Sequence, residues 1–299
     1  MNTFLVSAGH EMLNTRRART AHLLLFVFIG MVIASSIIGW VTNQTVTSVY
    51  ERVLADGLTT APNPFTGVTP LYYARNAVIY VLLIGSLMAI VLGVQATLRD
   101  RKAATIDLVL SRPVASASRL LGQLAGLGVV LAAVIAISFT TSWAIISAIN
   151  GAPLGWADTA RVLAFALLSW VLLTAFALLG MLTGLRSKQE TTALLVPFVI
   201  WSAVAFVIPQ IGTAARPVSL LNPVPAVTTA GGYFDAVSAI TGPLSITEQF
   251  KRASSIILQD ATVTGDATSS VLVLLAFLVV MTVVVVATPR NRMRSDLNE

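Results

Sequence analysis

The sequence predicts an all-α integral membrane protein with six transmembrane helices, and three observations carry that prediction. Charged residues make up 11% of the 299 residues and hydrophobic residues 56%, whereas ordinary soluble domains carry roughly 25% charged residues. Uncharged runs of about 20 residues, long enough to cross a bilayer as helix, recur along the chain. The alternating strands that a transmembrane barrel needs are not visible, so helices are the expected way to satisfy the backbone in lipid.

The N-terminal residues 1–19 are predicted to form an amphipathic helix that lies on the membrane surface. Phe4, Ala8 and Met12 recur at helical spacing among polar and basic residues. A solvated, poorly ordered terminus is the alternative. A cleaved signal peptide is not expected, because the following apolar run continues to Val41, beyond any plausible cleavage site.

Six spans are expected in a single transmembrane domain that covers residues 1–299. They lie at about residues 21–41, 77–98, 120–149, 162–185, 191–213 and 268–288. The third run exceeds one crossing, so it must tilt or protrude. The fifth contains Pro197 and Pro209, which are tolerated where neighbouring helices satisfy the freed carbonyl groups.

Two longer connections separate these spans. Residues 43–76 form a polar connection, in which a short amphipathic helix precedes a proline-rich loop. Residues 214–267 begin rich in Pro and Gly and become helical later, where Ser245 and Glu248 have the spacing of a capping box. The apolar stripe of that helix contains Ile246, Phe250, Ala253 and Ile257. It is expected at the outer surface, either against lipid or against an extracytoplasmic partner.

The distribution of basic residues predicts which side each connection faces. If the N-terminus is cytoplasmic, 13 of the 19 Lys and Arg residues fall in inner segments. The positive-inside rule therefore puts both termini in the cytoplasm. The net charge of +6 is explained by this topology and by anionic lipid, rather than by a nucleic-acid partner.

The chain lacks the residue sets that membrane enzymes and ion-coupled carriers use. The two histidines, His10 and His22, both lie at the N-terminal edge, so no Ser–His pair can form among the later spans. There is no cysteine, no HExxH motif, and no acidic residue in the core of an expected span. No GxxxxGK[ST] phosphate loop occurs either. The chain is thus expected to be neither an enzyme nor a cofactor-binding protein, and transport would need energy from a partner.

Two pairs of glycines have the spacing that lets membrane helices approach closely. Gly122 and Gly126 begin the third span, and Gly180 and Gly184 end the fourth. Both pairs are expected near the cytoplasmic face, where spans three and four would pack against each other. Background glycine, which is common in membrane helices, is the alternative.

Residues 99–119 form a charged island between two apolar runs. Read as a helix, the segment has an apolar side at Ile106, Leu108 and Leu110, and Pro113 ends it because proline disfavours helical geometry at the preceding residue. From the residues alone, an interfacial helix whose arginines contact lipid phosphates is equally acceptable.

The order RDRKAATIDLVLSRPVASASRLLGQLAG resembles the cytoplasmic segment between spans two and three of ABC-2 type permeases, the membrane subunits of ATP-binding-cassette transporters. It is most similar to the branch that includes permeases for multicopper-enzyme maturation. The matching residues are Asp100, Arg101, Lys102, Thr105, Ile106, Asp107, Leu108, Leu110, Arg112, Pro113, Val114, Ser116 and Arg119. Ala104 stands at the usual glycine, and Asp100 where a glutamate is common. The six spans, the N-terminal surface helix and the outer segment extend the resemblance to nearly the whole chain.

The resemblance implies that residues 99–119 dock on a separate ATPase subunit, which would bind the ATP and Mg²⁺. The residues expected at that contact are Asp100, Arg101, Lys102, Thr105, Asp107, Leu108, Arg112 and Pro113. It also implies a second permease copy in a homodimer and export rather than import, in a bacterial-type plasma or inner membrane. The pathway is expected along the uncharged faces of spans two and five at the dimer interface. A membrane scaffold or assembly factor without a transport role is the alternative.

Overall fold

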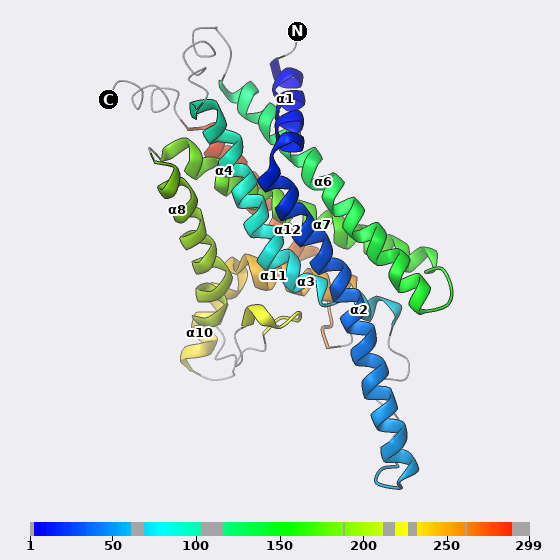
Figure 1. Ribbon diagram of the computed structural model, residues 1–299. Helices are drawn as coiled ribbons and strands as arrows, with labels where there is room; N and C mark the ends of the chain where they lie inside the picture. Colours follow the sequence, from blue (N-terminus) through cyan, green and yellow to red (C-terminus); the bar gives the residue numbers. More distant parts are fainter. Residues whose placement is uncertain are drawn as a thin grey trace.

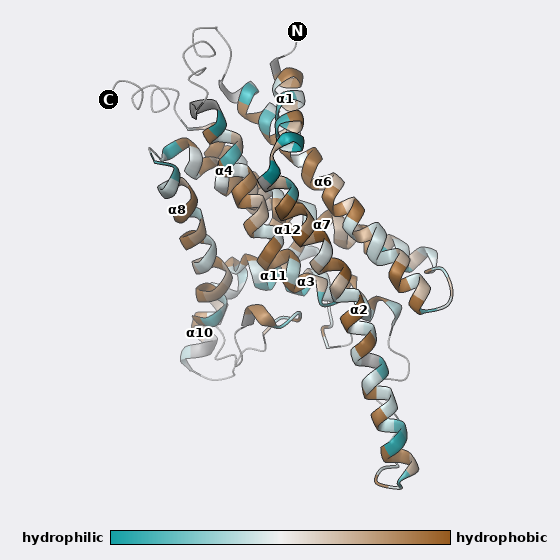
Figure 2. Cartoon of the chain, viewed as in Figure 1, coloured by the Kyte–Doolittle hydropathy of each residue, from teal (hydrophilic) through white to brown (hydrophobic). Residues whose placement is uncertain are grey.

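The computed structural model describes residues 3–60, 69–102, 116–187, 189–211, 219–226, 232–260 and 262–288. All regular secondary structure in these ranges is helical, and six of the helices are long and apolar enough to cross a membrane, which confirms the predicted fold class (Figure 1). The six are Ala21–Ala55, Pro70–Arg99, Ser118–Ile149, Trp156–Arg186, Glu190–Ile211 and Thr268–Val286. Apolar residues dominate the middle of these helices, and hydrophilic residues gather toward their ends (Figure 2).

The first two helices are α1 (Thr3–Arg17) and α2 (Arg19–Ala55), separated by Ala18, whose backbone is extended at φ −78° and ψ 114°. α2 has 37 residues, about 55 Å at 1.5 Å per residue, whereas a bilayer core is about 30 Å thick. It therefore projects well beyond the other helices (Figure 1).

The helix that contains the first expected span does not end near Val41. Residues 42–55 contain neither Gly nor Pro, and the Thr45 hydroxyl donates to the Val41 carbonyl oxygen at 2.9 Å, so nothing stops the helix from continuing. The polar connection expected from residue 43 is, up to Ala55, an extension of the same helix.

The second span is assembled from η1 (Pro70–Ala74), α3 (Ala77–Tyr80), the π-helical turn η2 (Val81–Gly85) and α4 (Ser86–Lys102). The third and fourth spans are α6 (Ser116–Ile149) and α7 (Trp156–Arg186). α7 is buried along most of its length and contacts α4, α6, α12 and α8. It is the central helix around which the other spans pack.

The fifth span consists of α8 (Glu190–Ser202), a second π-helical turn, η3 (Ala203–Val207), and α9 (Ile208–Ile211). As expected, groups on neighbouring helices satisfy the carbonyls that its prolines leave without an N–H donor. The Thr183 hydroxyl of α7 donates to the carbonyl oxygen of Ala193, four residues before Pro197, at 3.2 Å. In the π-helical register Pro209 frees the carbonyl of Val204, which lies 3.5 Å from the Thr247 hydroxyl.

The remaining described elements are η4 (Ser219–Leu221), α10 (Tyr233–Leu244), α11 (Ile246–Ile257) and α12 (Thr268–Val286). α10 and α11 lie at the opposite end of the bundle from α1, where α11 runs across the spans (Figure 1). We refer to these as the α11 end and the α1 end. The last turn of α4, the first turns of α6 and the end of α12 all lie at the α1 end.

Candidate functional site

The segment expected to dock on another protein connects α4 to α6 at the α1 end. Its central residues 103–115, including Thr105, Asp107, Leu108, Arg112 and Pro113, lie outside the described residues. The backbone of Asp100, Arg101 and Lys102 forms the last turn of α4. The structure therefore describes the frame of this candidate site: α1, the end of α4 and the start of α6.

An ion pair connects α1 to the end of α4 within this frame. Arg99 Nη2 lies 3.1 Å from Glu11 Oε1, and the Thr15 hydroxyl donates to the same oxygen at 3.1 Å. The Glu11 side chain is only 3% exposed and that of Arg99 is 30% exposed. Arg99 Nε also donates to the Gln95 carbonyl at 3.3 Å, whereas Nη1 is buried without a hydrogen-bond partner in the described part of the chain. Removing one member of such a pair leaves a buried charge uncompensated, so the pair holds α1 in place.

Gly122 and Gly126 allow α1 to lie directly against α6. A Cβ on Gly122 would lie 2.6 Å from the carbonyl oxygen of Phe4, and a Cβ on Gly126 would lie 2.5 Å from that of Ala8. The expected partner was wrong, since these glycines face α1 rather than the fourth span. The N-terminal helix thus contacts α6 through its backbone.

The second glycine pair also has a different partner from the one expected. A Cβ on Gly180 would clash with the Ile90 carbonyl oxygen, and one on Gly184 with the Thr97 hydroxyl, so this face of α7 packs against α4. Gly93 makes the reciprocal approach from α4, toward the Ala177 carbonyl. Sequence reasoning missed Gly93, although Ala89, Gly93 and Thr97 form a small-residue repeat of four that could have indicated it.

α4 and α6 are also joined directly, since the buried Gln123 amide lies within hydrogen-bond range of the Ala96 carbonyl, at 3.5 Å. Together, the two helices that flank the island are bound to α1, to α7 and to each other. These contacts join α1, α4, α6 and α7 at the α1 end of the bundle.

The middle of the bundle joins spans two and five, which the sequence expected to line a pathway. Trp201 Nε1 donates to the Ser86 hydroxyl at 2.6 Å, and that hydroxyl in turn donates to the Leu82 carbonyl. The two residues adjoin the two π-helical turns, η2 before Ser86 and η3 shortly after Trp201. π-helical turns are frequent at functional positions, because the extra residue weakens the regular hydrogen-bond ladder.

At the α11 end, α11 buries a polar face that the sequence had not indicated. Thr247, Lys251, Ser254 and Ser255 are each at most 1% exposed. The Lys251 ammonium lies 2.5 Å from Glu248 Oε1. Burial lowers the pKa of Lys251 from its ordinary value, against the raising effect of Glu248. The surface helix expected here is thus buried on one side against α7 and α12.

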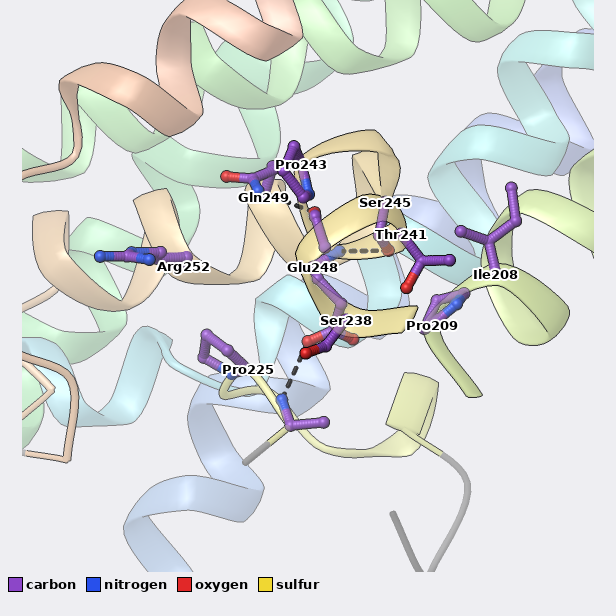
Figure 3. A pocket seen from close by; sticks show the side chains of 12 residues that line it. Ile208, Pro209, Pro225, Ser238, Thr241, Pro243, Ser245, Glu248, Gln249 and Arg252 are labelled. Carbon is purple, nitrogen blue, oxygen red and sulfur yellow. Dashed lines mark hydrogen bonds between the residues drawn. The ribbon is translucent and has the colours of Figure 1, made fainter. Parts of the chain in front are cut away.

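A cavity of about 270 Å³ lies between α9, α10 and α11. Figure 3 shows Glu248 at its centre, where Oε2 accepts from the Ala226 backbone N–H at 2.9 Å. The expected cap is confirmed in one half, because the Ser245 hydroxyl accepts from the Glu248 N–H at 3.5 Å. The second contact of a capping box, from the Glu248 carboxylate to the Ser245 N–H, is replaced: the carboxylate contacts the Lys251 ammonium and the Ala226 N–H instead. Because Gln249 also donates to the Gly242 carbonyl at 2.9 Å, these polar groups hold α10 and α11 together.

Among the described residues, no group of three or more His, Asp or Glu side chains could hold a metal ion. Two features of the described residues stand out instead. Several helices are in close contact at the α1 end, and spans two and five each contain a π-helical turn.

The comparison with protein families returns one family model, described as "ABC-2 family transporter protein", which matches residues 5–292. No curated protein matches the chain.

Proposed function

The chain belongs to the ABC-2 family of transporter proteins, and on that premise we propose that it is the permease subunit of an ATP-binding-cassette exporter. ATP would be hydrolysed by a separate subunit docked on residues 99–119. The match over residues 5–292 and six apolar helices support a multi-pass permease. The α1 end would face the cytoplasm of a bacterial-type plasma or inner membrane, and the chain itself would hold neither ATP nor another cofactor.

The observation that supports this proposal most directly is the buried pair of Glu11 and Arg99. This pair joins α1 to Arg99, where the island begins, and the contacts of Gly122 and Gly126 join α1 to α6, where the island ends. A short helix held rigidly at both ends can pass a partner's movement to the membrane helices. A helix held loosely would absorb that movement.

The transport step would take place where spans two and five meet. A movement of the island would displace α4 and α7 together, and the hydrogen bond between Trp201 and Ser86 would transmit this displacement to the fifth span. The π-helical turns beside these residues are the points at which the spans would bend. Two copies of the chain, related by a two-fold axis, would enclose the pathway.

The decisive experiment replaces Leu108, an apolar position of the island, by Glu. The affinity-tagged chain should co-purify from its native membranes with a subunit that carries a phosphate loop. Leu108→Glu should lose at least ten-fold of that subunit, because a charge in the apolar contact is desolvated without a partner. The matched control is Leu58→Glu, since Leu58 is 75% exposed at the other end of α2.

Two outcomes would count against the proposal. If the wild-type chain brings down no such ATPase, the scaffold or assembly-factor alternative takes its place. If Leu108→Glu retains the ATPase at the wild-type level, docking occurs at a surface other than residues 99–119.

A further inference from the structure

An open apolar groove with a volume of about 490 Å³ runs along the α1 end of the bundle. One wall is α6, where the lining residues recur three and four apart from Leu121 to Ala132. Phe4 of α1 lies at one side, and Trp170 of α7 and Leu278 of α12 lie across from α6. The groove therefore lies between four helices that the chain brings together from distant positions.

The lining is hydrocarbon, and no charged residue contributes to it. Two of its polar groups are bonded within the protein: Trp170 Nε1 donates to the Gly128 carbonyl at 2.8 Å, and the Thr282 hydroxyl donates to that of Leu278 at 2.8 Å. The third, the Thr174 hydroxyl oxygen, is buried and has no hydrogen-bond partner among the described residues. Since this oxygen is buried and no charged residue lines the groove, an occupant would be recognised mainly by shape and apolar contact.

The length of the groove matches one leaflet of a bilayer. Leu121 and Ala132 are eleven residues apart, about 16 Å along a helix. Half of the hydrocarbon core is about 15 Å thick. The groove starts beside Arg119, at the charged end of α6, and so extends from the membrane boundary to roughly the middle of the bilayer.

The volume favours a thin apolar occupant over a whole helix lying inside the groove. A helix of another protein molecule, at about 10 Å in diameter, would occupy roughly 1,200 Å³ over the same length, which is more than the groove holds. An extended hydrocarbon chain is thin enough to enter. Leaving the groove empty would forfeit the van der Waals contacts of its lining, and packing is what holds helices together in lipid.

We propose that this groove binds one acyl chain of a bilayer lipid, from the leaflet at the α1 end. The chain fills the space between α6, with Phe4 of α1, and the facing sides of α7 and α12. It is a structural ligand that packs α1 and the start of α6 onto the central helix. The residues that line it lie on α1, α6, α7 and α12, and none of them belongs to the residues expected to dock on the ATPase.

The test is photocrosslinking of the full-length chain in nanodiscs. A small fraction of the phosphatidylcholine carries a diazirine on one acyl chain, and the modified peptides are identified by mass spectrometry after irradiation. Adducts are expected on α7 at Trp170 or Thr174 and on α12 near Leu278. Ala132→Phe, which fills the groove, should reduce them at least five-fold, and the milder Ala132→Leu should reduce them about two-fold.

Ala133→Phe is the matched control, because Ala133 is exposed on the same helix but does not line the groove. It should leave the adducts unchanged. Equal labelling in the Ala132 and Ala133 variants, or no adducts on α7 and α12, would overturn the proposal. So would disulfide-linked dimers of Ala132→Cys in native membranes, since the chain has no cysteine of its own and such dimers would put a second copy on this face.

Discussion

At the scale of single residues, the closest helix–helix contacts of this protein occur at glycines, which have no side chain. Gly93 on α4 and Gly180 on α7 each lie against a backbone carbonyl of the other helix, at Ala177 and Ile90. In lipid no hydrophobic effect drives helices together, so close backbone contact is one of the few sources of affinity between them. Glycine is therefore a contact residue here rather than a flexible one.

Adding one methyl group at these contacts should be costly. Gly180→Ala would place a Cβ against the Ile90 carbonyl oxygen, and Gly126→Ala would place one 2.5 Å from that of Ala8. Each should destabilise the folded chain by about 1–3 kcal/mol, as overpacking does. The measurement is the thermal unfolding midpoint in detergent, together with the yield of monodisperse protein.

Gly30→Ala is the control for these variants, because no atom lies within 4 Å of the position that a Cβ on Gly30 would take. The same change there should be neutral or slightly stabilising, since Ala is the better helix former. If Gly180→Ala unfolds at the same temperature as Gly30→Ala, the two helices can separate without loss, and the contact does not matter for stability.

At the scale of elements, α11 shows how a short helix can be fixed across the end of a bundle. Its buried Lys251 is paired with Glu248, and the nearby Asp260 pairs with Arg75 at 3.2 Å. Burial works to raise the pKa of Asp260, but hydrogen bonds from Thr262 and the charge of Arg75 outweigh it and hold that pKa below its usual value. The Arg75–Asp260 pair connects the end of α11 to the second span, whereas the Lys251–Glu248 pair lies within α11 itself. The buried Phe250 and Ala253 pack α11 against the bundle.

The pair of Lys251 and Glu248 should behave as a coupled unit. Lys251→Met leaves the Glu248 carboxylate without its cation and should cost about 1–3 kcal/mol. The double variant with Glu248→Gln should recover more than half of that loss, because a neutral pair avoids the desolvation of two charges. Thermal unfolding midpoints of the wild type, both single variants and the double variant form the required cycle.

Arg252→Met serves as the control for this cycle, since Arg252 is the exposed neighbour of Lys251. Losses that simply add in the double variant would show that the two groups do not act on each other, and the burial of Lys251 would then need another explanation.

The elements also show which features a sequence can predict and which it cannot. Apolar runs predicted all six spans, because hydropathy is a property of the run itself. The continuation of α2 to Ala55 was missed, since the polarity of residues 43–55 was read as a connection although it forbids no helix. The partners of Gly122 and Gly180 were missed for another reason: a GxxxG spacing indicates a close contact but does not name the helix on the other side.

The same distinction applies to the candidate site. The charged island and its resemblance to ABC-2 permeases could be recognised from residue order, and the family match confirms that family. The ion pair of Glu11 and Arg99 could not be predicted from residue order, because the two residues are 88 positions apart and no local pattern connects them. The burial of Lys251 could not be predicted for a similar reason, since that face of α11 is buried only because α11 packs against α7 and α12.

At the scale of the whole molecule, the two ends of the bundle differ in charge. Arg16, Arg17, Arg99 and Arg186 all lie at the α1 end, where the island also begins. At the α11 end, by contrast, basic residues such as Arg75 and Lys251 are paired with acids of the same chain. The positive-inside rule puts the end of the bundle that is richer in Lys and Arg in the cytoplasm, and the proposed ATPase could reach residues 99–119 only from that side.

Single cysteines can test this orientation, because the chain contains none. Leu58→Cys and Trp156→Cys, at positions 75% and 88% exposed at the α11 end, should react with a membrane-impermeant maleimide in intact cells. Arg16→Cys and Gln189→Cys, both exposed at the α1 end, should react only after the membrane is opened. The reverse pattern would put the island outside the cell, where no ATP is available. It would remove the proposed energy source and leave the acyl-chain site in place but in the outer leaflet.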